Sequence, residues 1–130
     1  MVDKHRTEET IRVPVRRLDD VLAEQGVDRV RFIKIDVEGL EPEVLAGAPR
    51  LLASREPPIV CYEHGIYRHS KAVPDLLPRE YVLFQLAGTA HRVSRLVEAS
   101  PRRLRADNVF AIPGSQIDSL PRDLFEQRAG

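Results

Sequence analysis

Two short apolar segments separated by one amphipathic stretch constrain the fold of this chain more than any other feature. Residues 30–37 (VRFIKIDV) and 59–63 (IVCYE) are rich in β-branched and aromatic side chains, which favour strands. Between them, apolar residues recur at the spacing of one helical face: Val44, Leu45, Ala48, Leu51 and Leu52. A strand, a helix and a second strand in this order predict a βαβ unit, with parallel strands and a right-handed crossover.

Prolines and glycines mark where the elements of the first half should begin and end. Residues 11–16 alternate apolar and polar side chains and predict a half-buried strand, which Pro14 restricts to a sheet edge. We expect Asp19 to cap a short helix and Gly26 to end that helix in a left-handed turn. Pro49 should kink or break the later helix near residues 46–47.

The second half of the chain has strand signals without long helices between them. Residues 66–80 read as a loop with one helical turn at 74–77, and strands are expected at 81–86, about 92–97 and 108–112. Strands without crossover helices pair antiparallel. We therefore expect an α/β fold that starts with a parallel βαβ unit and ends with antiparallel strands. The expected domain spans residues 11–113, between a flexible N-terminus (1–10) and a C-terminal tail (114–130).

Composition excludes some partners and suggests a compartment. Lys plus Arg equals Asp plus Glu at 20 each, so no net charge favours nucleic acid or an anionic membrane surface. No apolar run approaches the roughly 20 residues that span a bilayer. The single cysteine, Cys61, cannot form an internal disulfide, which is typical of a reducing compartment. A soluble, cytoplasmic chain is the expectation.

Acidic side chains follow both strands of the predicted βαβ unit. Asp36 and Glu38 leave the first strand, and Glu63 and His64 leave the second. Ligands of open α/β sheets bind beyond the carboxyl ends of parallel strands, where such groups act as a base or hold hydroxyls and amines. The alternative is that Glu38 and Glu41 only cap the following helix, and that Glu63 and His64 are solvated loop residues. The scattered histidines lack metal-ligand spacing, so we expect no metal site.

The string FIKIDVEGLEPEVLAGA (residues 32–48) resembles the signature of FkbM-type methyltransferases, whose central motif reads approximately I-K-I-D-V-E-G-x-E-x-x-V-L-x-G-A. The resemblance extends upstream to VPVRRLDDVL (13–22), and downstream to the strand ending at Glu63 and to NVFAIP (108–113). It implies a partial Rossmann-like methyltransferase fold. It also implies methyl transfer from S-adenosylmethionine to a hydroxyl of a sugar, polyketide or similar small metabolite.

The resemblance also assigns roles to the acidic cluster. Asp36 would lie beside the transferred methyl group and accept the substrate's proton, while Glu38 would orient the turn or a ligand amine. Asp36 and Glu38 are thus the expected cofactor-binding residues. Asp36, Glu63 and His64 are the expected catalytic residues, the last two lining the pocket of the hydroxyl acceptor.

In that family a glycine turn, D-x-G-A-x-x-G, and an acidic ribose partner precede the motif, and residues 1–12 contain no counterpart. We therefore expect the C-terminal half of such an enzyme, which binds the cofactor weakly and needs an N-terminal half for activity. One edge of the strand at 30–37 should then be open. The alternative function is a noncatalytic remnant or split-enzyme half that binds a partner chain, or a second copy, through this edge.

Overall fold

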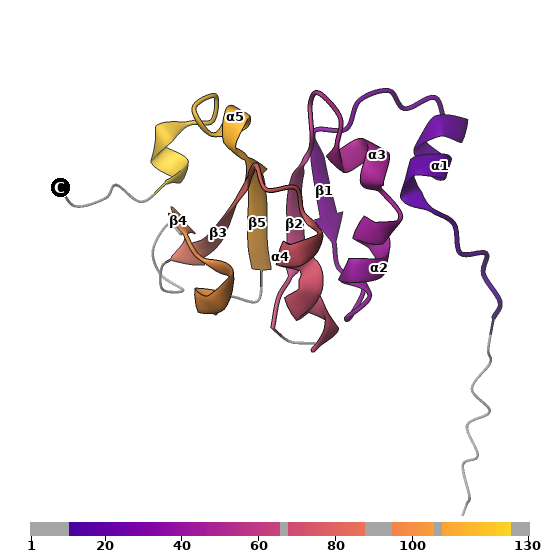
Figure 1. The fold of residues 1–130 in the computed structure, drawn as a ribbon, viewed down its shortest axis with the longest axis horizontal. Helices are drawn as coiled ribbons and strands as arrows, with labels where there is room; N and C mark the ends of the chain where they lie inside the picture. Colours follow the sequence, from indigo (N-terminus) through magenta and orange to yellow (C-terminus); the bar gives the residue numbers. More distant parts are fainter. Residues whose placement is uncertain (1–10, 66–67, 88–94, 106–107, 126–130) are drawn as a thin grey trace, which may run out of the picture.

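The computed structural model describes residues 11–65, 68–87, 95–105 and 108–125. These residues form a five-stranded mixed sheet in the order β1-β2-β5-β3-β4 (Figure 1). Its strands are β1 (Phe32–Ile35), β2 (Ile59–Glu63), β3 (Tyr81–Ala87), β4 (Arg95–Glu98) and β5 (Asn108–Pro113). The sheet is α/β and mixed, as expected for a partial Rossmann-like fold.

The predicted βαβ unit is confirmed. β1 and β2 pair parallel, in a register that places Phe32 opposite Ile59 and Ile35 opposite Tyr62. Two helices connect them, α2 (Glu41–Ala46) and α3 (Pro49–Leu52), because the helical stretch breaks before Pro49 as predicted. The remaining pairs, β2 with β5, β5 with β3 and β3 with β4, are antiparallel, again as predicted. Residues 92–94 of the predicted fourth strand lie outside the described residues.

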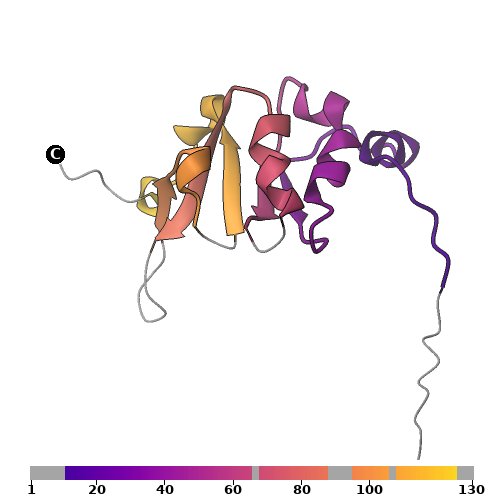
Figure 2. The same ribbon diagram turned by 60° about the horizontal axis from the view of Figure 1, so that its bottom comes forward.

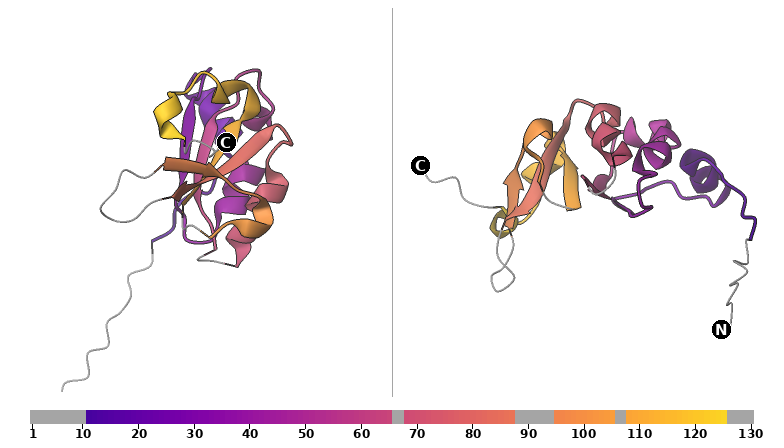
Figure 3. Two further views of the ribbon diagram at one scale, coloured as in Figure 1. Left: turned by 90° about the vertical axis from the view of Figure 1, so that its left-hand side faces the viewer. Right: turned by 90° about the horizontal axis from the view of Figure 1, so that it is seen from below.

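Helices cover one face of the sheet. After β2 the chain forms the 3-10 helix η1 (His69–Ala72) and α4 (Val73–Leu76), where the sequence predicted one helical turn. α2, α3 and α4 lie along the same face, and α1 (Leu18–Glu24) lies beside α3 (Figures 2 and 3). The core consists of buried strand side chains and the helix side chains that pack on them: Ile35, Val60, Tyr62, Leu83, Val109 and Ala111 against Leu45, Leu52, Val73 and Leu77.

The C-terminal elements are short. They comprise η2 (Pro101–Arg103), α5 (Gly114–Ile117) and η3 (Arg122–Leu124). Phe125, which follows η3, meets Phe84 edge to face with 5.3 Å between ring centroids. No helix in the described part of the chain is long and apolar enough to cross a membrane.

The predicted strand at residues 11–15 is wrong. The segment has no regular structure, and its apolar side chains are exposed: Ile11 to 80%, Val13 to 69% and Val15 to 95%. Alternation makes a strand possible, but a strand also needs a neighbour to accept its hydrogen bonds. No described strand lies beside this segment.

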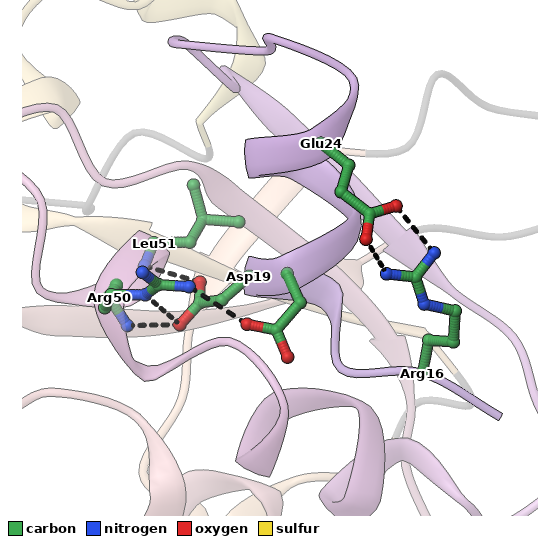
Figure 4. Close-up of polar contacts among 6 residues, drawn as sticks. Arg16, Asp19, Glu24, Arg50 and Leu51 are labelled. Atoms are coloured by element: carbon green, nitrogen blue, oxygen red, sulfur yellow. Dashed lines mark hydrogen bonds and ion pairs between the residues drawn. The ribbon is translucent and has the colours of Figure 1, made fainter.

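The predicted capping role of Asp19 is also wrong, whereas that of Gly26 is confirmed. α1 begins at Leu18, so Asp19 lies inside its first turn, and Arg17 precedes the helix without a side-chain cap. Asp19 instead accepts hydrogen bonds from the backbone N–H groups of Arg50 (2.8 Å) and Leu51 (3.0 Å) in α3 (Figure 4). Gly26 follows α1 with φ at 63°, the left-handed turn that the sequence predicted.

Candidate functional site

The parallel strands β1 and β2 release acidic residues at the same end of the sheet. Because Ile35 lies opposite Tyr62, the next residue on each strand, Asp36 and Glu63, emerge side by side. The charges of Asp36 and Glu38 both act on the pKa of Glu63. The predicted gathering of Asp36, Glu38 and Glu63 is therefore confirmed, while their catalytic and binding roles stay predictions.

The turn between β1 and α2 has an unusual backbone. Glu38 has φ at 52° and Gly39 has φ at 102°, so both residues adopt left-handed conformations. Glycine tolerates this region, whereas a side chain such as that of Glu38 is strained there and needs support from its surroundings. Gly39 is buried and Glu38 is exposed. The turn thus presents the Glu38 carboxylate to solvent at the end of the sheet.

Glu41 supplies the support, and the sequence analysis missed this role. Its carboxylate is fully buried and accepts hydrogen bonds from the backbone N–H groups of Gly39 (3.2 Å) and Val37 (3.4 Å) and from Ser70 Oγ (2.6 Å). Burial alone would raise the pKa of Glu41, but these hydrogen bonds hold it below the ordinary value. Glu41 therefore joins the β1–α2 turn to η1.

One sequence signal could have revealed Glu41. A carboxylate two residues after the glycine of a turn, at the start of a helix, can fold back on N–H groups that lack helical partners. Glu41 has this spacing from Gly39. Ser70 carries no comparable signal, since it reaches the site only because η1 packs on α2.

Glu63 is the cluster member with a raised pKa. Partial burial contributes most, followed by the negative charges of Asp36, Glu41 and Glu38. Lys34, which forms an ion pair with Asp36, opposes the shift. A carboxylate whose pKa lies above its ordinary value is a stronger proton acceptor once it is ionised.

His64 is buried rather than solvated, so the alternative that treated it as a solvated loop residue is wrong. It is 8% exposed and meets Tyr62 edge to face, with 5.9 Å between ring centroids. Burial lowers the pKa of His64, and the charge of Lys71 lowers it further. Among the described residues, no hydrogen-bond partner meets His64 Nδ1 or the hydroxyl of Tyr62. A buried imidazole with one unpaired nitrogen therefore follows Glu63 at the end of β2.

Neither a pocket nor a group of metal ligands was found at this site among the described residues. The described residues contain no group of three His, Cys, Asp or Glu side chains placed to hold a metal ion. Three surface pockets have volumes of about 560, 640 and 520 Å³. None of the three is lined by Asp36, Glu38, Glu63 or His64. The candidate site is an acidic edge of the sheet.

Comparison with protein families yields a match over more than half of the chain. The family model described as "Methyltransferase FkbM domain" matches residues 2–82, which include β1, α2, α3 and β2. The similarity noted in the sequence at residues 108–113 lies beyond the matched segment. No curated protein and no solved structure matches the chain.

Proposed function

The chain belongs to the FkbM methyltransferase family, and from this premise we propose that it takes part in methyl transfer from S-adenosylmethionine to a hydroxyl of a sugar or other small metabolite. The observation that carries the proposal is the acidic cluster at the carboxyl end of β1 and β2, where ligands of open α/β sheets bind. We place the activity in the cytoplasm, which the single buried Cys61 suits.

The acidic residues of the cluster suit the positively charged groups of the methyl donor. S-adenosylmethionine carries a sulfonium and an ammonium, and the cluster sets Asp36, Glu38 and Glu63 against the single positive charge of Lys34. Asp36 and Glu38 would hold the cofactor, which supplies an electrophilic methyl group when bound. The backbone donors of a glycine turn would come from sequence outside these 130 residues, in the same polypeptide or another.

The chain's own residues then position the acceptor and take its proton. Asp36 and Glu63 are the proposed proton acceptors, and the raised pKa supports Glu63 in this role. The buried, neutral His64 would orient the acceptor side of the site. Positioning dominates such a transfer, since the methyl group, sulfur and hydroxyl oxygen must align. Glu41 joins the β1–α2 turn to η1, and this connection supports the alignment.

Calorimetric titration with S-adenosylhomocysteine tests the proposal. The 130-residue chain alone should bind it weakly, because several contacts worth about 1–3 kcal/mol each are absent, which costs several orders of magnitude in affinity. Adding the N-terminal half of an FkbM methyltransferase that carries D-x-G-A-x-x-G, fused or in trans, should restore micromolar binding. Failure of every such complex to bind would contradict the cofactor assignment. Micromolar binding by the chain alone would show that other residues replace the glycine turn.

Substitution of Glu63 separates chemistry from binding. In the complemented enzyme, Glu63→Gln should lower turnover by about 10²–10⁴-fold and leave affinity for S-adenosylhomocysteine unchanged. The rate of the unsubstituted enzyme should rise with pH through the pKa of Glu63, above the ordinary value of 4.5. Glu80→Gln, an exposed residue before β3, is the control. Unchanged turnover in Glu63→Gln would remove Glu63 from the catalytic assignment.

The second candidate function is a noncatalytic module, or half of a split enzyme, that binds a partner chain through the edge of β1. It is favoured by the position of β1 at the end of the sheet, where Phe32 is 52% exposed. A noncatalytic module predicts no cofactor binding in any complex, whereas half of a split enzyme predicts binding only with its N-terminal half in trans, so the same titration distinguishes a noncatalytic module from methyl transfer.

A further inference from the structure

Among the described residues, β1 presents backbone groups without a strand partner along its outer edge. The N–H of Ile59 donates to the carbonyl of Arg31 (2.9 Å), so alternate residues, 31, 33 and 35, turn their backbone groups toward β2. The N–H and C=O groups of Phe32 and Lys34 therefore point away from β2. No described strand pairs with this side of β1. Such an edge is a template for strand addition.

Residues 11–15 (IRVPV), here called the arm, have a sequence that can form backbone hydrogen bonds with this edge. In Figure 1 the arm leads away from the start of α1, and Ile11, Val13 and Val15 are exposed. If the arm is extended, these three residues turn their backbone groups to one side, and Arg12 and Pro14 turn theirs to the other. Pro14 has no N–H to donate, so it fits where its backbone faces solvent. The arm can thus pair through residues 11, 13 and 15 without losing a hydrogen bond at Pro14.

We propose that two copies of this chain exchange arms, each arm pairing antiparallel with β1 of the other copy. With Val15 opposite Phe32, Val13 lies opposite Lys34, and all facing backbone groups find partners. Opposed residues of antiparallel strands share a face, so Val15 covers the exposed ring of Phe32. A twofold axis makes the exchange reciprocal, and both open edges close.

The antiparallel orientation follows from geometry. Opposed residues of antiparallel strands exchange both N–H and C=O bonds, so Val15 can bond fully with Phe32 and Val13 with Lys34. Antiparallel pairs are also slightly more stable per residue than parallel ones. This inference deepens the second candidate function by naming its partner, and it does not rest on methyl transfer.

Analytical ultracentrifugation up to millimolar concentration tests the exchange. The chain should be a dimer, and Val15→Asp should raise its dissociation constant at least about tenfold, because a charge then lies opposite the apolar ring of Phe32. The controls are Val27→Asp and Leu124→Asp, each replacing an apolar residue that is 43% exposed elsewhere. All five arm residues are exposed in their own copy, so substitutions in the arm should leave the circular dichroism spectrum unchanged.

Disulfide trapping identifies the pairing. A Val15→Cys chain mixed with a Phe32→Cys chain should yield the mixed disulfide dimer on oxidation, whereas Val27→Cys with Phe32→Cys should not. The buried native Cys61 is common to all variants. A chain that stays monomeric, a dimer that ignores the arm substitutions, or a Val15→Cys/Phe32→Cys chain that closes on itself as a monomer would each overturn the proposal. These readouts are independent of cofactor binding, so they fail or succeed separately from the proposed methyl transfer.

Discussion

At the scale of single residues, carboxylates whose charges act on one another have different chemistry because their surroundings differ. Glu63 is partly buried among negative charges, and its pKa is raised. Glu41 is more deeply buried, yet its pKa is lowered because backbone N–H groups and Ser70 stabilise the ionised form. Burial alone therefore does not set the direction of the shift, and the hydrogen bonds to the charged form decide it.

Glu41→Gln should destabilise the chain by about 1–3 kcal/mol at pH 7, since the buried N–H groups lose an ionised acceptor. A lowered pKa in the folded state contributes stability above the unfolded value of 4.5, and this contribution is lost as pH falls through the folded pKa. The difference between variant and unsubstituted chain should therefore shrink in acid. Urea unfolding at several pH values measures it.

Glu43→Gln is the matched control, because Glu43 is exposed on the same helix. It should change the free energy of unfolding by less than about 0.5 kcal/mol. A difference for Glu41→Gln that stays constant from pH 7 to below 4.5 would contradict the role given to the ionised carboxylate.

At the scale of elements, the helices are too short to be stable alone and depend on contacts with one another. α3 has four residues and α1 has seven, whereas isolated helices of fewer than about 12 residues are marginal in water. Asp19 of α1 caps the free N–H groups at the start of α3, and the Asp19 N–H donates to the carbonyl of Gly47 (3.0 Å). The two helices therefore stabilise each other.

Asp19→Ala should lower the free energy of unfolding by about 1–2 kcal/mol, the usual cost of removing a helix cap. Urea unfolding at pH 7 measures the loss, and amide shifts should change most at Arg50 and Leu51. The control is Asp20→Ala, which removes an exposed ion pair with Arg50 (3.1 Å) and should cost less than about 1 kcal/mol. Equal losses in the two variants would contradict the capping role.

At the scale of the whole molecule, the middle of the sheet comes from near the end of the described chain. β5 lies between β2 and β3 and pairs antiparallel with both. The family match ends at residue 82, so the matched segment does not include the strand that joins the two halves of the sheet. The parallel β1–β2 pair therefore depends on residues outside the matched segment.

A chain that ends at residue 107 should consequently fail to fold cooperatively, because β2 and β3 lose their common neighbour and Val109, Ala111 and Ile112 leave the core. A chain that ends at Phe125 keeps every described element and is the control. Near-ultraviolet circular dichroism and thermal unfolding compare the two. A cooperative transition in the shorter chain would show that the matched segment folds without β5.

Local sequence patterns were sufficient to predict most of the secondary structure. Side-chain alternation and β-branching predicted β1, β2 and β5, and proline and glycine predicted the break before α3 and the end of α1. These signals act within a few residues, through backbone sterics and side-chain spacing. The gathering of Asp36 with Glu63 was also predictable, since parallel strands end on the same side.

Contacts between residues far apart in the sequence determine the features that local patterns did not predict. Asp19 meets the backbone of Arg50 across 31 residues and Glu41 meets Ser70 across 29, and no local pattern indicates either partner. The arm at residues 11–15 has the alternation of a strand and pairs with no described strand of its own chain, because pairing requires a neighbouring edge as well as a suitable sequence. Hydrogen bonds need a partner in space, and only the packing of the whole chain decides which partner is within reach.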